Sequence, residues 1–117
     1  MPSAYRRTLM KLIIAYIRPE MLQNVKQELY LHEIYALSVT NILGAGRQKG
    51  YTEQYRGVTT QVNLLKKLRL ELCVSDDKAA VAVQAIMDGG RTGHEGDGAV
   101  LVQDVVSATR IRTGQPL

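Results

Sequence analysis

The chain has 117 residues, enough for one domain, although a domain of this size leaves a larger surface fraction than bigger ones do. Its 45% hydrophobic and 22% charged residues are ordinary for a globular protein and exclude a disordered or fibrous chain. The formal net charge of +4 is spread out, since only Arg6/Arg7 and Lys66/Lys67 are adjacent basic pairs, and Phe and Trp are absent. Nucleic-acid binders usually carry clustered basic residues and aromatic stacking platforms, so we expect no nucleic-acid partner.

The cysteine content and the absence of long apolar runs bear on where the protein works. Cys73 is the single cysteine and lies in an apolar-alternating run, where a lone thiol is expected to be a small buried hydrophobe. One cysteine excludes a disulfide within the chain and suits a reducing cytoplasm, so we expect a cytoplasmic protein. No run approaches the roughly 20 apolar residues that span a bilayer, and we expect no direct membrane insertion. Residues 1–9 lack the apolar stretch of a signal peptide and are expected to form a flexible extension before a single domain at 10–117.

The first part of the domain predicts a strand, a helix and a second strand. Residues 11–17 are dense in β-branched and apolar side chains, and Pro19 then suits the first turn of a helix. Between 20 and 30, apolar residues recur at helical spacing with polar residues opposite, which predicts one amphipathic helix. Residues 36–43 predict a second strand, which ends at a glycine-rich stretch.

That polar, glycine-rich stretch runs over about 44–63. Structureless stretches of this length are uncommon inside a compact domain and are usually functional. Its glycines alternate with Arg47, Lys49 and Arg56, so mobility and positive charge occur together, and a phosphate ligand or an acidic partner surface would suit it. The alternative is a plain solvated hairpin loop.

The rest of the chain predicts a strand, a helix and a last strand. Apolar residues alternate with polar ones up to residue 74, and Ser75-Asp76-Asp77 supplies N-cap candidates for a helix that ends at Gly89-Gly90. A second loop over 91–98 leads to a strand over 99–104. The order β-α-β-β-α-β predicts an α+β protein of the ferredoxin-like class, with an antiparallel four-stranded sheet and both helices on one face.

Both faces of the first strand are at least partly apolar, which bears on oligomerisation. Two sets of alternate residues compete for the helix side: Ile13, Ala15 and Ile17, or Leu12, Ile14 and Tyr16. The helices cover only one face, so the other face needs a partner. Sheet-to-sheet oligomerisation is therefore the natural hypothesis.

Two further segments could bind phosphate. Thr92-Gly93-His94-Glu95-Gly96-Asp97-Gly98 is a second glycine cluster, whose backbone amides could form an anion-binding concavity, although a tight connection would use the same glycines. Arg110 and Arg112 lie two apart, so an extended backbone would point both guanidinium groups to one side, where they could bind two phosphate groups. A solvated terminal tail is the alternative for the arginines.

Catalytic residues are not evident. His32 and His94 are far apart and lack a cysteine at metal-ligand spacing, so solvated histidines explain them better. Asp76 and Asp77 are better explained as helix caps than as an acid–base pair, and no P-loop sequence occurs. We therefore expect no enzyme activity.

Four motifs, in order, resemble those of the PII family of nitrogen-regulatory signal proteins. Residues 44–57, GAGRQKGYTEQYRG, are similar to the family's G-x-G-R-Q-K-G-x-T-E-x-Y-R-G run. The other three motifs are VSDD at 74–77, TGHEGDG at 92–98 and RIRTG at 110–114. The resemblance spans Met10 to Gly114. It implies a homotrimer in which the long loop at about 44–63, called the T-loop, contacts a target protein, either an enzyme or a membrane transporter.

The same resemblance implies sites for ATP or ADP in the clefts between subunits. The residues that would bind the nucleotide are Gly46, Arg47, Gln48, Gly96, Asp97, Gly98, Arg110 and Arg112. Gln48 would also help to coordinate Mg²⁺ with ATP and 2-oxoglutarate, and Lys67 would pair with a carboxylate of 2-oxoglutarate, for which an ammonium group is a suitable partner. The implied function is non-enzymatic regulation of nitrogen metabolism through the T-loop.

Three positions depart from the family pattern. Ala99 stands where a phosphate-contacting lysine is usual, so ATP binding should weaken more than ADP binding. Thr60 replaces the tyrosine that is uridylylated in many members, and Ala45 replaces a common phenylalanine. The departures leave an alternative open, a divergent PII-like sensor that prefers ADP or AMP and serves another metabolite or transporter, for instance bicarbonate or a metal-linked signal. Gln48 and Lys67 argue against it because they fit 2-oxoglutarate.

Overall fold

The computed structural model describes residues 9–45, 51–55, 58–62 and 64–117. The strands are β1 (Met10–Ile17), β2 (Ser38–Gly44), β3 (Tyr51–Tyr55), β4 (Val58–Val62), β5 (Leu65–Ser75) and β6 (Ala99–Asp104). The helices are α1 (Leu22–Leu31) and α2 (Ala79–Gly90), and a 3₁₀ turn precedes each, at Pro19–Met21 and at Asp76–Lys78. The extension expected at 1–9 lies outside the described residues except for Leu9.

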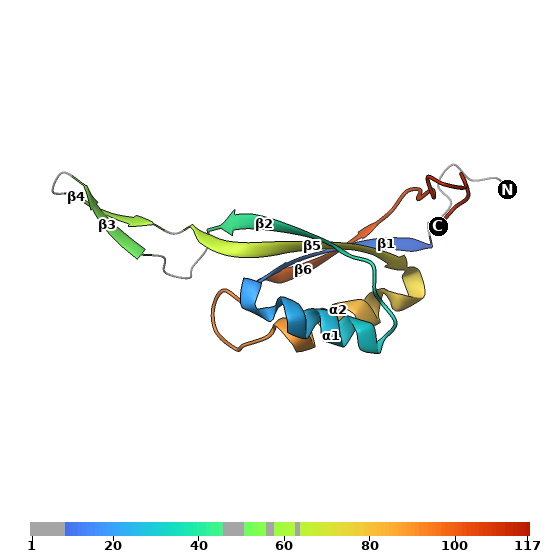
Figure 1. Ribbon diagram of the computed structural model, residues 1–117, viewed down its shortest axis with the longest axis horizontal. Coiled ribbons are helices and arrows are strands. Elements are labelled where there is room, and N and C mark those ends of the chain that lie inside the picture. The colour runs from blue at the N-terminus through green and yellow to red at the C-terminus, as the bar shows by residue number, and fades with distance from the viewer. Residues whose placement is uncertain (1–8, 46–50, 56–57, 63) are drawn as a thin grey trace.

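The main sheet has four strands in the order β2-β5-β1-β6, and every neighbouring pair is antiparallel. Both helices lie on the same face of this sheet, side by side (Figure 1). β1 lies in the middle because it pairs with β5 on one side and with β6 on the other. The predicted α+β ferredoxin-like class is therefore confirmed.

The helix-facing side of the sheet forms the core. Ile13, Ala15 and Ile17 take the helix side of β1 and are at most 2% exposed. Alternate residues of β5 join them and pack against α1 and α2; the buried set is completed by Leu68, Leu70, Leu72, Val74, Val25, Leu29, Ile34, Ala79, Ala82, Ala85 and Ile86. Since successive strand residues alternate between faces, Leu12, Ile14 and Tyr16 lie on the open face of the sheet. Of the two sets of alternate β1 residues, the one that contains Ile13 therefore packs against the helices.

Cys73 is exposed, so the prediction of a buried thiol is wrong for the single chain. Its neighbours Leu72 and Val74 are both buried against the helices. Strand alternation therefore places Cys73 on the open face, where it lies opposite Leu12 of β1.

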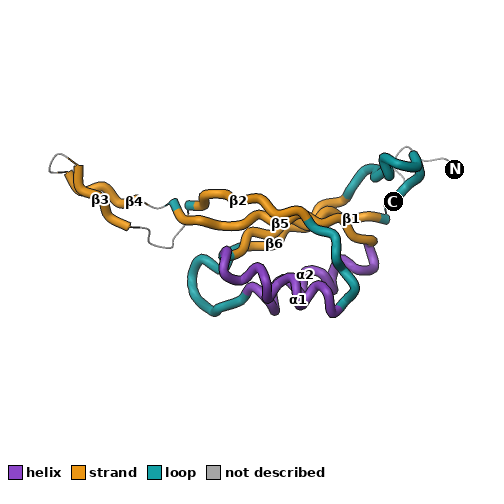
Figure 2. The backbone as a smooth tube through the Cα atoms, viewed as in Figure 1, coloured by secondary structure: helices purple, strands orange, loops and turns teal. Residues whose placement is uncertain are grey.

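The T-loop contains two strands, whereas the sequence predicted a structureless functional stretch or, as the alternative, a plain hairpin loop. β3 and β4 pair as an antiparallel hairpin, from Tyr51 opposite Val62 to Tyr55 opposite Val58. The hairpin projects from one end of the main sheet (Figure 2), and the molecule measures 68 Å along its longest axis. Both strands are rich in tyrosine, threonine and valine, which favour strands, although glycines and charged residues flank them.

The capping prediction at the start of α2 is also corrected. Ser75 precedes the 3₁₀ turn in an extended conformation and makes no side-chain capping hydrogen bond. The Asp76 carboxylate instead forms an ion pair with the Lys11 ammonium at 2.7 Å, and that ammonium lies 2.6 Å from Asp104 as well. The two carboxylates raise the pKa of Lys11, with Asp104 the larger cause.

α1 ends in a motif that normally uses glycine. Glu33 has a positive φ of 60°, and its N–H and that of Ile34 donate to the carbonyls of Tyr30 and Leu29, both at 3.0 Å. This pair of bonds is a Schellman motif, whose left-handed position is usually glycine because a Cβ there is strained.

Replacing Glu33 with glycine should therefore raise the free energy of unfolding by about 0.5–1 kcal/mol, after the greater entropy of glycine in the unfolded chain is deducted. Urea denaturation of the two proteins would measure the gain. Glu33→Ala keeps the Cβ and is the control. An equal gain in that variant would assign the effect to the lost charge instead of the backbone.

Candidate functional site

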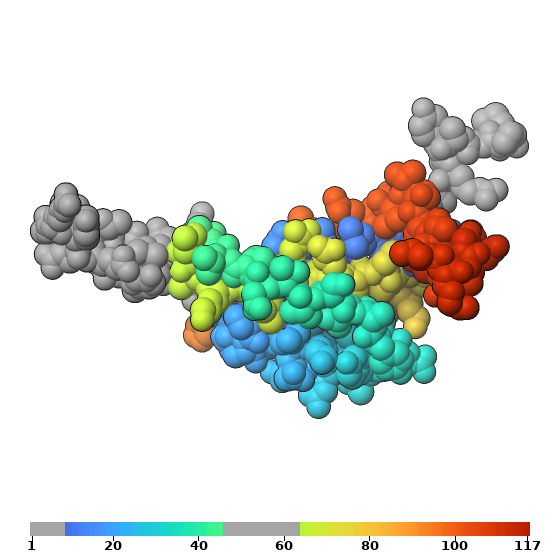
Figure 3. All heavy atoms as spheres, turned by 45° about the horizontal axis from the view of Figure 1, so that its top comes forward, coloured from blue at the N-terminus to red at the C-terminus, as the bar shows by residue number. Residues whose placement is uncertain are grey.

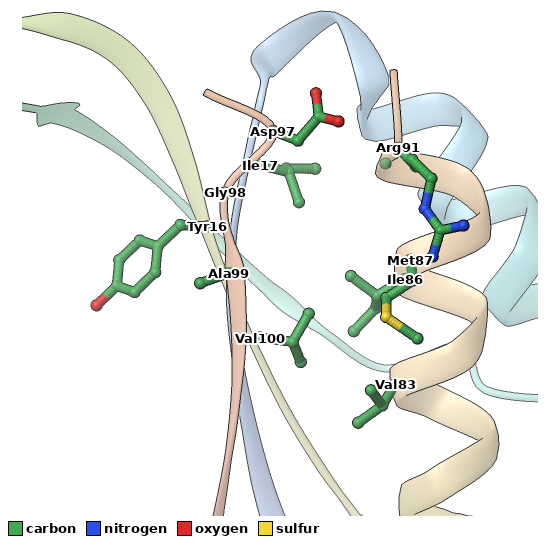
Figure 4. Close-up of a pocket in the computed structure, with 11 residues that line it drawn as sticks. Tyr16, Ile17, Val83, Ile86, Met87, Arg91, Asp97, Gly98, Ala99 and Val100 are labelled. Carbon is green, nitrogen blue, oxygen red and sulfur yellow. The ribbon is translucent and has the colours of Figure 1, made fainter. Parts of the chain in front are cut away.

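Two cavities meet at the start of β6. One, of about 280 Å³, lies between α2 and β6 and is lined by Val83, Ile86 and Met87 among other residues (Figure 4). The other, of about 550 Å³, is lined by the end of β2, by Lys67 and by Glu95 and Gly96. Gly98 and Ala99 line both. The loop at 91–98 therefore forms part of the wall of each cavity.

The carboxylate of Asp97 closes this loop on itself. Its Oδ2 accepts hydrogen bonds from the backbone N–H groups of Thr92 and Gly93, each at 2.8 Å, and its Oδ1 accepts one from the Thr92 hydroxyl. These bonds, the one from the Thr92 hydroxyl first, hold the pKa of Asp97 far below its usual range. Asp97 is therefore ionised at neutral pH, and its carboxylate ties the end of the 91–98 loop to the start of that loop.

Two cations attach the loop to the sheet. Arg18, directly after β1, places its Nε 3.0 Å from Asp97 Oδ1 and donates through Nη2 to the carbonyl of Glu95. Lys67, on β5, donates through Nζ to the carbonyl of Gly96. Arg18 was not predicted as a site residue, since its only signal in the sequence is a charged residue immediately after an apolar strand.

The environment of Lys67 suits an anionic ligand. Burial and the nearby charge of Arg18 lower the pKa of Lys67, burial being the larger cause. The side chain also lines the larger cavity, so a ligand there would meet its ammonium group. An anion would relieve both effects, because it offers the partly desolvated cation an opposite charge.

Gly98 allows β6 to start close against β1. Its φ is +106°, and a Cβ at this position would lie 1.7 Å from the carbonyl oxygen of Tyr16. Only glycine fits such a position without strain. The structure thus places Lys67 beside Gly96, Asp97 and Gly98, four of the site residues that the family resemblance implies.

Arg110 and Arg112 are not part of this cluster in a single chain. They lie in a C-terminal segment at the other end of the main sheet from the 91–98 loop (Figures 1 and 3). The segment is a tight turn instead of the extended backbone predicted, since Gly114 N–H donates to the Arg110 carbonyl at 2.7 Å. The predicted ligands Gly46, Arg47 and Gln48 lie outside the described residues.

The described part of the chain offers no other evident centre. Within it, no group of three or more His, Cys, Asp or Glu side chains is placed to hold a metal ion. Among its helices, none is both long and apolar enough to cross a membrane.

Comparison with known proteins agrees with this geometry. The family model described as nitrogen regulatory protein P-II matches residues 10–115. The nitrogen regulatory protein P-II of Cereibacter sphaeroides is 44% identical over 106 residues, covering 91% of this chain and 95% of its own. Nitrogen regulatory protein P-II 1 of Methanothermobacter thermautotrophicus is 42% identical over 106 residues, with 91% and 92% covered.

A solved structure supports the same assignment. The crystal structure of Arabidopsis thaliana PII bound to citrate matches with a TM-score of 0.74 and 27% identity, covering 92% of this chain and 88% of that one. The family match spans nearly the whole domain, and the four-stranded sheet with its two helices is shared. This chain therefore belongs to the PII family of nitrogen-regulatory signal-transduction proteins.

Proposed function

We propose that this protein is a non-enzymatic regulator that binds ATP or ADP and 2-oxoglutarate, and that it controls a target protein of nitrogen metabolism through its T-loop. The observation that carries the proposal is the cavity of about 550 Å³ where the base of the T-loop, the 91–98 loop and Lys67 meet. Ligand occupancy at the base of a loop can select among the conformations of that loop. The target, an enzyme or a membrane transporter, would read the selected conformation.

Lys67 is the proposed partner of a 2-oxoglutarate carboxylate. It lines the cavity, and its pKa is lowered by burial and by the charge of Arg18. An incoming carboxylate would therefore form an ion pair with a partly desolvated ammonium group. Gln48 is proposed to coordinate Mg²⁺ together with ATP and 2-oxoglutarate. The Arabidopsis relative was solved with citrate, a polycarboxylate, which is compatible with carboxylate binding in this fold.

The site also requires a second subunit. Arg110 and Arg112 are proposed phosphate ligands, yet their C-terminal segment and the 91–98 loop lie at opposite ends of the main sheet (Figure 1). A neighbouring subunit could supply them, in a head-to-tail arrangement that closes into a ring. We propose that this ring is a homotrimer, with one nucleotide in each cleft.

Ala99 favours a second candidate function. It lines both cavities at the position where the family pattern has a phosphate-contacting lysine. Without that cation the γ-phosphate of ATP loses a partner, so the protein could be a divergent sensor that prefers ADP or AMP and responds to another metabolite.

Titration calorimetry with ATP, ADP and AMP, each with and without Mg²⁺ and 2-oxoglutarate, tests the proposal. We expect ADP to bind and Mg²⁺-ATP to bind more tightly when 2-oxoglutarate is present. Binding of ADP or AMP that ignores 2-oxoglutarate would support the second candidate. No binding of any nucleotide would overturn both.

In the same titrations, Arg112→Ala should lower nucleotide affinity about tenfold, because one charge-assisted contact to phosphate is lost. Its side chain is exposed, so the free energy of unfolding should change by less than about 0.5 kcal/mol. Lys26→Ala, which removes a charge on α1 away from both cavities, is the control. Unchanged affinity in Arg112→Ala would show that the pocket assignment is wrong.

A further inference from the structure

Arg18 bonds to the loop that lines both cavities but lines neither cavity itself. Its guanidinium contacts Asp97 through Nε at 3.0 Å and the Glu95 carbonyl through Nη2. Asp97 lies on the wall of the smaller cavity, and Glu95 lies on the wall of the larger one. The Arg18 side chain is only 15% exposed, so its charge is directed to the loop and not to solvent.

We propose that Arg18 is the positioning residue of the anion-binding loop, setting the affinity for nucleotide phosphates through Asp97 and Glu95 without touching the ligand. This inference rests on the proposed nucleotide-binding function. A bidentate guanidinium that fixes both a backbone carbonyl and a carboxylate restrains the orientation of the peptide groups between them. Those peptide groups belong to Gly96 and Asp97, which are among the proposed nucleotide-binding residues.

The other cation that holds the 91–98 loop, Lys67, is expected to lose its contact with the loop when a ligand binds. The ammonium of Lys67 donates to the Gly96 carbonyl. A ligand anion in the larger cavity would compete with that carbonyl for the same ammonium. Arg18, which lies outside the cavity, keeps its contacts whether or not the ligand is present.

Electrostatics give Arg18 a second effect on the same site. Asp97 is ionised at any working pH, and its carboxylate would repel a phosphate bound beside it. The guanidinium at 3.0 Å offsets this charge. Removing Arg18 therefore both loosens the loop and leaves a negative charge at an anion site.

The test compares Arg18→Gln and Arg18→Lys with Lys11→Gln in ADP calorimetry, with thermal unfolding measured for each variant. Lys11 lies on β1 near the end away from Arg18, is 11% exposed and pairs with Asp76 and Asp104 at 2.7 and 2.6 Å. It therefore matches Arg18 in burial and ion pairing, but it lines neither cavity.

We expect Arg18→Gln to weaken ADP binding about tenfold, the size typical of a lost supporting contact. Arg18→Lys should recover only part of the affinity, because it keeps the positive charge but cannot contact Asp97 and the Glu95 carbonyl through two guanidinium nitrogens at once. Lys11→Gln should lower the melting temperature comparably and leave affinity unchanged. Amide hydrogen exchange at Thr92 and Gly93 should rise in Arg18→Gln and stay unchanged in Lys11→Gln.

The outcomes separate this inference from the proposed function. Normal ADP binding in Arg18→Gln, with the parent protein binding, would overturn the role of Arg18 alone. An equal affinity loss in Lys11→Gln would also overturn it, because affinity would then follow overall stability. If the parent protein binds neither ADP nor any other adenine nucleotide, the proposed function fails, and this role of Arg18 fails with it.

Discussion

Replacing Gly98 with alanine is expected to destabilise the protein by more than about 4 kcal/mol. The added Cβ would lie 1.7 Å from the carbonyl oxygen of Tyr16 and 2.7 Å from its carbonyl carbon, and both atoms belong to the backbone of β1. The φ of +106° adds strain for any residue that has a Cβ. Because no side chain can move aside, β6 must separate from β1 where the sheet meets the candidate site.

Gly93 provides the matched control for this substitution. It lies in the same loop with a positive φ of +89°, but a Cβ there would have no atom within 4 Å. Gly93→Ala should therefore cost only the backbone strain, about 1–2 kcal/mol. Expression yield, circular dichroism and urea denaturation would measure both variants. Similar losses in the two would show that φ alone, and not the contact with β1, decides the effect.

Gly89→Ala is expected to cost about 3 kcal/mol, through the packing of the two helices. A Cβ at Gly89 would lie 2.6 Å from the Cα of Val25 and 2.8 Å from the carbonyl carbon of Asn24. The backbones of α1 and α2 thus touch at this point, and a methyl group would push the helices apart over a core that is already filled. The expected reporter is the midpoint of urea unfolding.

Gly90, the next residue, separates this contact from helix propensity. A Cβ there would lie 3.6 Å from methyl groups of Ile17 and Val25, an ordinary van der Waals distance. Alanine is the better helix former by up to about 1 kcal/mol, so Gly90→Ala should be neutral or stabilising. If Gly89→Ala were equally neutral, the close helix contact would be disproved.

The order of elements and the fold class could be predicted because they depend on local patterns. Apolar alternation, helical spacing and Pro19 predicted the elements of the main domain within a few residues. The strands β3 and β4 were not predicted, because the many glycines and charged residues of this stretch indicated a loop even though Tyr, Thr and Val favour strands. The helix-cap prediction for residues 75–77 failed for another reason. The Asp76 carboxylate pairs with Lys11, which lies 65 positions earlier, and no local pattern reveals such a partner.

The candidate site was only partly predictable. Gly96, Asp97, Gly98 and Lys67 were identified through the PII resemblance, and the structure places them at one cavity wall or beside it. Arg18 was not identified, because its role exists only where the end of β1 meets a loop 79 residues later in sequence. The arginines of the C-terminal turn were predicted as phosphate ligands, and a single chain places that turn at the far end of the sheet (Figure 1).

The periodicities, the positions of the glycines and the family motifs are local properties of the chain and are visible in its residues alone. Tertiary structure decided which alternate residues of β1 face the helices, that Cys73 lies on the open face, and that Arg18 and Lys67 both bond to the 91–98 loop. The physical reason is that strand alternation specifies two faces without saying which is buried. Likewise, the partner of a charge depends on the segments that the sheet brings together.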